Sequence, residues 1–294
     1  MAILLDKSTR AIIQGITGGY AQNQVRVMQG YGTNIVAGVT PGKSGGEVHG
    51  IPIFDTVREA LHAYPANASV IYVSGPRVKD AALEALEAGI KLLVIATEGV
   101  PLHDAMTIRD QASKHDAWII GPNSIGTISP GKSLLGTLNP SFATPGHVGL
   151  ISRSGTLSME VTRMLTEAEL GQSTCVAIGG DRIIGKTQTD YLRLFEKDPD
   201  TRAVVLLGEI GGGMEQEAAG YIAQMTKPVV TYIVGRAAPA GKRMGHIGAM
   251  VSGQSDSYEA KVSALRQAGA VVAETLWDIP RLVAETLSRG QKEV

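Results

Sequence analysis

Residues 69–95, SVIYVSGPRVKDAALEALEAGIKLLVI, contain two short apolar runs separated by an amphipathic stretch. The runs Ser69–Val73 and Lys91–Ile95 have the length and the β-branched or aliphatic composition of buried strands. Between them, Val78–Ala88 has apolar residues at the three- and four-residue spacing of a helix that packs on one face. Two strands joined by such a helix form a parallel β-α-β unit, so this segment predicts an α/β fold.

The same alternation continues on both sides of this segment and predicts a first domain at residues 1–122. Further strands are expected at Ala11–Ile16, Asn34–Val39 and Ala117–Ile120, and further helices at Gln22–Tyr31, Thr56–Ala63 and Leu102–His115. The tripeptide Gly121-Pro122-Asn123 ends the alternation, and the stretch Ser129–Gly146 is rich in Gly, Ser and Pro. Because this composition is typical of loops, we expect a linker at residues 123–146.

The alternation then restarts and predicts a second domain at residues 147–294. The expected strands are His147–Ser152, Thr174–Ile178, Ala203–Leu207, Val229–Val234 and Ala270–Val272. The expected helices are Leu157–Glu167, Asp190–Lys197, Met214–Met225, Ser257–Ala268 and Trp277–Ser288. Two consecutive domains with parallel sheets are therefore the predicted architecture, and ligands are expected beyond the carboxyl ends of the strands.

The composition narrows the function classes. The 294 residues are 44% hydrophobic and 19% charged, which is typical of a packed core and not of a disordered chain. A net charge of −1 does not suggest a global basic face for nucleic acid, so any anion site must be local. The single cysteine, Cys175, excludes an internal disulfide and a cysteine zinc cluster. With neither a signal peptide nor a long apolar run in the sequence, we expect a cytoplasmic protein without a membrane partner.

Three segments after predicted strands have residues that can contact phosphate. In GITGG, Thr17 and its glycines allow a close backbone approach at a helix N-terminus, although a tight turn explains the pattern equally well. In TPGKSGG, Lys43 is either a phosphate contact or a solvated loop lysine. In SRSGT, Ser154, Gly155 and Thr156 either hold an anion at a helix start or only cap that helix.

A fourth segment, GKRMGHIGA, places His246 between glycines and after two cations. Imidazole is a nucleophile near neutral pH, so His246 is a candidate to carry a phosphoryl group, the alternative being an ordinary loop histidine. Glu209, in GEIGG after the predicted strand AVVLL, is the best candidate for a carboxylate that orients this ring, unless it only faces solvent. The other histidines show no metal-binding spacing, so no metal is expected on this chain.

Together these segments resemble the alpha subunits of succinate–CoA ligase over essentially the whole chain. The motifs that carry the resemblance are VTPGKSGG, IATEGVP, GPNSIG, VGLISRSGTL, GQSTCVAIGGD, GEIGG and APAGKRMGHIGA. The resemblance implies an N-terminal Rossmann-like CoA-binding domain and a C-terminal flavodoxin-like ligase domain. It also implies a role in the tricarboxylic acid cycle and an ATP-grasp beta subunit that binds ATP or GTP with Mg²⁺, in a heterodimer or a heterotetramer.

The resemblance also implies roles for individual residues. His246 matches the phosphorylated histidine, Glu209 its carboxylate partner, and Ser154, Gly155 and Thr156 the helix end that holds the phosphate. The implied CoA contacts are Thr17, Gly18, Gly19, Tyr20, Lys43, Ala96, Thr97 and Glu98. In the implied reaction, a nucleoside triphosphate phosphorylates the histidine, the phosphate passes to a carboxylic acid, and CoA displaces it from the acyl phosphate.

Some positions depart from the family pattern. Met159 stands where the family has a tyrosine near the substrate carboxylate, which removes a hydroxyl donor. Arg182 and Lys186 stand in a segment where proline and serine are usual, and the residues after Gly19 also differ from the family. These departures suggest an acid other than succinate, such as sulfoacetate or malate, while a divergent succinate enzyme stays open.

Two further functions compete with the ligase interpretation. A non-catalytic CoA-binding protein is disfavoured because His246 and Glu209 are both present. A nicotinamide-dependent dehydrogenase is disfavoured because the chain has no complete G-x-G-x-x-G motif and the second strand ends at Val39-Thr40-Pro41 without an acidic residue.

Overall fold

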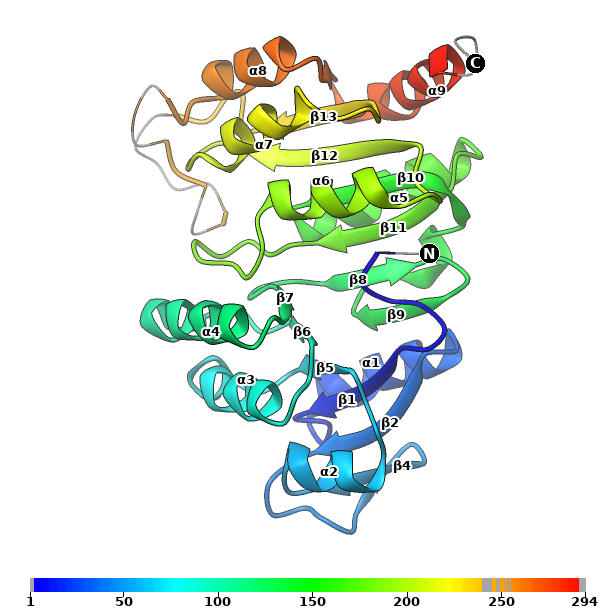
Figure 1. Ribbon diagram of the computed structural model, residues 1–294, viewed down its shortest axis with the longest axis vertical. Coiled ribbons are helices and arrows are strands. Elements are labelled where there is room, and N and C mark those ends of the chain that lie inside the picture. Colours follow the sequence, from blue (N-terminus) through cyan, green and yellow to red (C-terminus); the bar gives the residue numbers. More distant parts are fainter. Residues whose placement is uncertain (1–2, 240–244, 247–248, 252, 254, 291–294) are drawn as a thin grey trace. The chain divides into compact units, whose positions relative to one another are not determined.

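The computed structural model describes residues 3–239, 245–246, 249–251, 253 and 255–290 (Figure 1). The chain forms two compact units. The N-terminal unit consists of Leu4–Pro140 and Ile183–Lys186, and the C-terminal unit consists of Met1–Ile3, Ser141–Arg182 and Thr187–Val294. Each unit contains a mainly parallel sheet covered by helices, so the predicted pair of α/β domains is confirmed. Within the described residues, no helix is long and apolar enough to cross a membrane.

The N-terminal unit is built on one sheet in the order β3-β4-β2-β1-β5-β6-β7. Its strands are β1 (Arg10–Gln14), β2 (Asn34–Val39), β3 (Glu47–Val48), β4 (Ile51–Phe54), β5 (Ala68–Ile71), β6 (Leu92–Ile95) and β7 (Trp118–Ile120). Its helices are α1 (Gly19–Gly30), α2 (Val57–Ala63), α3 (Val78–Glu87) and α4 (Leu102–Lys114), with a 3₁₀ turn, η1, at Gly75–Arg77. All pairs are parallel except β3 with β4, so the loops after β1, β2, β5 and β6 meet at one edge.

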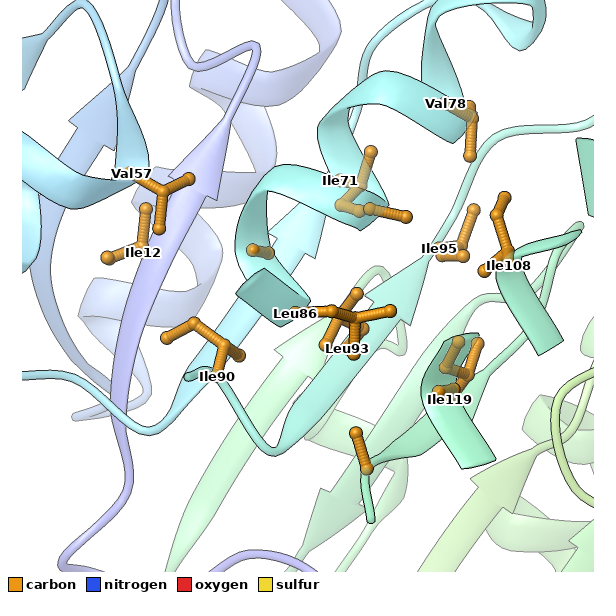
Figure 2. Packing of buried hydrophobic residues seen from close by; sticks show 14 of the residues in the cluster. Ile12, Val57, Ile71, Val78, Leu86, Ile90, Leu93, Ile95, Ile108 and Ile119 are labelled. Atoms are coloured by element: carbon orange, nitrogen blue, oxygen red, sulfur yellow. The ribbon is translucent and has the colours of Figure 1, made fainter. Parts of the chain in front are cut away.

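The core of this unit lies between the sheet and helices α2, α3 and α4. Figure 2 shows Ile71 and Ile95 from β5 and β6 in one cluster with Leu86 of α3 and Ile108 of α4. Each of these side chains is at most 2% exposed, and burying one aliphatic side chain stabilises the fold by roughly 1.5–3 kcal/mol. The helix spacing read from residues 78–88 therefore corresponds to a real buried face, because Ala82, Ala85 and Leu86 are all buried.

A hairpin lies in the segment expected to be a linker. It consists of β8 (Gly126–Ser129) and β9 (Ser133–Gly136), which pair antiparallel, and the 3₁₀ turn η2 follows at Pro140–Phe142. The hairpin is fixed to the N-terminal unit because the Thr33 hydroxyl donates to the Leu134 carbonyl (2.8 Å) and accepts from the Leu134 amide (3.1 Å). The compact units divide after Pro140, whereas the boundaries at 122 and 147 remain a prediction.

The C-terminal unit holds parallel strands in the order β14-β13-β12-β10-β11. These strands are β10 (Pro145–Ser152), β11 (Gln172–Ala177), β12 (Ala203–Glu209), β13 (Val229–Val234) and β14 (Val271–Val272). The helices are α5 (Gly155–Glu167), α6 (Gln188–Lys197), α7 (Met214–Ile222), α8 (Tyr258–Gln267) and α9 (Ile279–Gly290), with a 3₁₀ turn, η3, at Leu276–Asp278. The carboxyl ends of β10, β11 and β12 therefore lie together at one edge, which places the loops that follow them side by side.

Most of the expected elements occur within a few residues of their predicted bounds. The strands Asn34–Val39 and Val229–Val234 match, whereas α1 begins three residues earlier than expected because Gly18 and Gly19 open the helix. Strands β3 and β4 were not predicted, since β3 has two residues and β4 contains a proline.

Candidate functional site

His246 and Glu209 form the centre of a site in the C-terminal unit. Glu209 is the last residue of β12 and is buried, and His246 lies in the segment that follows β13. His246 Nδ1 lies 2.7 Å from Glu209 Oε2. A carboxylate oxygen accepts hydrogen bonds, so Nδ1 donates in this contact, and in the neutral ring Nε2 then has the lone pair. The predicted pair is thus in direct contact. The two cations before it, Lys242 and Arg243, lie outside the described residues.

The charges around the ring alter its basicity. The hydrogen bond to Glu209 raises the pKa of His246 above its usual value, although partial burial opposes this shift. The charges of Glu209 and Asp181 also raise this pKa, and that of Arg153 lowers it. Arg153 is buried, and its Nε lies 3.4 Å from Glu209 Oε1. This distance allows an ion pair, while the guanidinium makes its hydrogen bonds to the carbonyls of Gly179 (3.3 Å) and Asp181 (2.7 Å). Glu209 therefore lies between the imidazole and a fixed cation.

Gly180, in the loop after β11, leaves the space that the imidazole fills. A Cβ atom at this position would lie 2.8 Å from His246 Cδ2 and 2.9 Å from Nε2. Real Cβ atoms do not approach other heavy atoms so closely, so a larger residue must displace either the ring or the loop.

We expect Gly180→Ala to lower the rate of histidine phosphorylation about 10- to 100-fold, because the methyl group displaces the reacting ring. Rapid-quench measurement of phosphoprotein formation checks this, with the midpoint of thermal unfolding as the measure of folding. Gly253→Ala is the control, since a Cβ at Gly253 meets no atom of the described residues within 4 Å. Equal phosphorylation rates in the two variants would show that the ring does not need this space.

The N-terminal end of α5 borders the site formed by His246 and Glu209. The Ser154 side chain caps this helix by accepting from the Leu157 amide (3.3 Å). A pocket of about 170 Å³ is lined by Arg153, Ser154, Leu157, Leu207, Gly208, Glu209, Val234, Gly245 and His246. The structure thus brings Ser154 together with the histidine and its carboxylate. Gly155, Thr156 and Met159 are also on α5 but do not line this pocket.

A larger pocket, of about 920 Å³, lies in the N-terminal unit. Its lining residues are Gln14, Gly15, Thr17, Val39, Thr40, Pro41, Gly42, Asp55, Thr56, Val73, Arg77, Asp80, Ala81 and Glu84. They come from the carboxyl ends of β1 and β2, from the segments after β1, β2, β4 and β5, and from α3. Ligands bind at this edge in open α/β sheets. Among the expected CoA contacts, Thr17 lines the pocket, and its hydroxyl lies 3.3 Å from that of Thr40. The other expected contacts do not line it: Gly18, Gly19, Tyr20, Lys43, Ala96, Thr97 and Glu98.

The loop that contains Lys43 is held by hydrogen bonds to Asp55, which the sequence did not indicate. The Asp55 carboxylate accepts from the amides of Lys43 and Ser44, both at 3.1 Å. Asp55 follows β4, a strand missed by the sequence patterns, so this contact had no visible signal. The sequence patterns also missed three pocket residues that follow β5, namely Arg77, Asp80 and Glu84. A signal was present, because ligands bind beyond the carboxyl ends of parallel strands and these residues lie within residues 69–95.

The two cations that suggested an unusual acid lie in different environments. The ammonium group of Lys186 lies 5.0 Å from the centre of the Trp118 ring, within cation–π range. Arg182 is exposed. Across the described part of the chain, no group of three or more His, Cys, Asp or Glu residues could hold a metal ion.

The chain is similar to known proteins over its full length. Residues 6–99 match the model of the CoA binding domain, and residues 151–271 match that of CoA-ligase. A succinate–CoA ligase (ADP-forming) alpha subunit from Archaeoglobus fulgidus is 50% identical over 287 residues, which cover 98% of this chain and 99% of that one. A malate–CoA ligase alpha subunit from Methylorubrum extorquens is 43% identical over 296 residues, 99% of this chain and 100% of that one.

Among the solved structures similar in both fold and sequence is an ATP citrate lyase from Methanothrix soehngenii in complex with citrate and coenzyme A, with a TM-score of 0.90 and 28% identity. The match covers 99% of this chain and 51% of that chain, so this chain spans about half the length of the lyase chain.

Proposed function

This chain belongs to the family of succinate–CoA ligase alpha subunits and is thus one subunit of an acid–CoA ligase, and we propose that His246 carries the phosphoryl group in its reaction. The observation that supports this role is the 2.7 Å hydrogen bond between His246 Nδ1 and Glu209. It fixes one tautomer and leaves Nε2 as the nucleophile. Relatives that match over nearly the full length and are named succinate–CoA ligase alpha subunits support the assignment of the overall reaction.

In the proposed mechanism, Nε2 attacks the terminal phosphorus of a nucleoside triphosphate. The Nε2–P bond forms as the bond to the leaving nucleoside diphosphate breaks, and the ring becomes positively charged. Glu209, hydrogen-bonded at Nδ1, stabilises that charge, and the N-terminal end of α5 at Ser154–Thr156 stabilises the added phosphate. A carboxylate oxygen of the acid then attacks the phosphorus, the Nε2–P bond breaks, and the neutral ring is restored. Splitting the reaction in this way gives the acid a good leaving group.

We place CoA, which supplies the thiol that accepts the acyl group, at the pocket of the N-terminal unit. Its volume of about 920 Å³ is within the range of sites for ligands of this size. Gly18 caps α1 without a side-chain acceptor, which leaves the amides at the start of that helix for a phosphate. Thr17 is the proposed contact that lines this pocket. The proposed contacts outside its lining are Gly18, Gly19 and Tyr20 at the start of α1, Lys43 after β2, and Ala96, Thr97 and Glu98 after β6.

The ligase requires a second subunit, because its relatives are alpha subunits of a multi-subunit enzyme. We propose that this partner is an ATP-grasp beta subunit that binds ATP or GTP together with Mg²⁺, in a heterodimer or heterotetramer. In that arrangement the partner supplies the triphosphate, and this chain supplies the histidine and the CoA site.

The phosphohistidine is tested by incubating the complex of the chain and its beta subunit with triphosphate labelled in the γ position. We expect label in this chain that is lost in acid and kept in base, the stability expected of a phosphorus–nitrogen bond. Fragmentation by electron transfer should place the phosphate on His246. Label on a different residue, or label that survives acid, would contradict the mechanism.

Succinate is the acid that the proposed function favours. The relatives at 47–51% identity are succinate enzymes, while the malate enzyme is 43% identical. Lys186, which had suggested a more anionic acid, contacts the Trp118 ring instead. We expect kcat/KM for succinate to exceed that for malate and sulfoacetate by at least about tenfold, because one added hydroxyl or one missing methylene changes this ratio by roughly 10- to 200-fold. A coupled assay of the three acids at saturating CoA and ATP measures this ratio, and a higher value for malate would assign the chain to the other substrate.

A further inference from the structure

Two charged side chains are wholly buried beside the His246 site without lining its pocket. Lys261 of α8 is 0% exposed, and Glu215 of α7 is 1% exposed. The Lys261 ammonium donates to a carboxylate oxygen of Glu215 and to the Gly211 carbonyl, the latter at 2.8 Å. Taking two charges out of water costs several kcal/mol for each ion, and a buried pair often stabilises a fold no better than apolar residues of similar size. The position of this pair therefore suggests a role other than stability.

The contacts of the pair converge on the backbone around Glu209. Glu215 Oε1 accepts from the Glu209 amide at 3.3 Å and from Gln188 Nε2 at 2.9 Å. On the other side of Ile210, the Gly211 carbonyl accepts from Lys261. The carboxylate also packs closely against this turn, because a Cβ at Gly208 would lie 2.7 Å from Glu215 Cγ. The backbone is thus held before and after Glu209 by two side chains from two different helices.

Elsewhere in this turn, the Ile210 amide donates to the Val234 carbonyl (3.1 Å) and the Gly211 amide donates to the Asp256 carbonyl (3.0 Å), whereas the Glu209 amide donates to Glu215. The turn continues through Gly211 and Gly212, which both adopt left-handed conformations with φ of +86° and +62°. Glycine reaches many other conformations at little cost, so neighbouring glycines do not by themselves fix the direction of the Glu209 side chain. That direction matters because the Glu209 carboxylate makes the hydrogen bond to the His246 ring.

We infer that Glu215 and Lys261 are positioning residues of the phosphoryl-transfer site, which hold the Glu209 backbone so that its carboxylate orients the His246 ring. The inference rests on the proposed phosphorylation of His246. Neither residue contacts the ring itself. Among the residues that the structure describes, the charged groups that act on the ring are Glu209 from β12, Arg153 from the loop after β10, and Asp181 from the loop after β11.

The test uses the double variant Glu215→Leu with Lys261→Met in the complex with the beta subunit. An apolar pair of similar size leaves no unpaired buried charge, so folding should be retained. We expect kcat to fall about 10- to 100-fold, as is typical when a residue that orients a catalytic group is lost. We also expect the acid limb of the kcat/KM profile to move to lower pH, because a weaker Glu209 contact lowers the pKa of the ring.

Two further variants keep the test decisive. Glu215→Gln with Lys261→Met retains an oxygen that can accept from the Glu209 amide, so it should recover part of the activity and of the acid limb. Lys227→Met is the matched control, since the Lys227 ammonium also donates to two carbonyls, those of Phe195 and Asp198, but at the opposite ends of the strands. It should leave both the acid limb and kcat unchanged.

An unchanged acid limb in the two double variants would overturn the inference, whatever the fall in kcat, because a merely structural role predicts that result. The proposed function is judged separately by the His246→Asn variant. If that variant takes no phosphate while the double variants keep the wild-type acid limb, the positioning inference fails and the phosphohistidine stands. If the His246→Asn chain is still phosphorylated, the proposed function fails, and the positioning inference that rests on it fails too.

Discussion

The His246→Asn variant is expected to lose acyl-CoA synthesis by roughly 10⁴-fold or more, the scale seen when an enzyme loses its nucleophile. Asparagine can still donate a hydrogen bond to Glu209 at the position of Nδ1, but its amide nitrogen has no available lone pair to attack phosphorus. The variant therefore removes the chemistry while keeping the main contact of the site. The measurement is the initial rate of CoA thioester formation in the complex with the beta subunit.

The fold of this variant should be preserved, because the His246 side chain is 27% exposed and no buried cavity results. Circular dichroism and the midpoint of thermal unfolding check this. His147→Asn is the matched control, since His147 is an exposed histidine of the same unit at the opposite end of β10, where its ring contacts the Asp200 carbonyl. Thioester synthesis by His246→Asn at a tenth of the wild-type rate would rule out a phosphohistidine on the main reaction path.

Much of the fold could be predicted because buried parallel strands are continuous apolar runs. Asn34–Val39 and Val229–Val234 were predicted to the residue for this reason. The hairpin at residues 126–136 was missed because its strands have only four residues each, with glycines at both outer ends. Its stability comes from contacts such as that between Thr33 and Leu134, which are 101 residues apart and invisible to a local pattern.

The reactive residues of the site could be predicted, whereas their supports could not. His246 and Glu209 stand among glycines after predicted strands, and that setting is unusual for a core residue. Glu215, in the first turn of α7, looks like an ordinary favourable charge at a helix start, and Lys261 looks like a solvated helix residue. The packing of α7 against α6 and α8 contributes to burying them, and such tertiary contacts have no periodic signal in the sequence.

Glu209→Gln separates the charge of this carboxylate from its hydrogen bond. The glutamine oxygen can still accept from His246 Nδ1, so the tautomer can be retained, but no negative charge remains to stabilise the phosphorylated ring. We expect kcat for thioester synthesis to fall about 10²-fold, at the upper end of what loss of such a partner costs. Glu217→Gln is the control, since Glu217 is an exposed carboxylate on the neighbouring helix α7.

The pH profile gives the sharper test of this variant. The hydrogen bond to Glu209 is the largest cause that raises the pKa of His246, and its charge adds to the effect. Since only the neutral ring can attack phosphorus, the acid limb of the kcat/KM profile follows this pKa. Removing the charge lowers the pKa, so the acid limb should move to lower pH, and the fall in kcat/KM should be smallest under acidic conditions. Profiles measured between pH 5 and 8 decide the point, because a limb that stays in place or moves upward would mean that Glu209 does not act through the His246 ring.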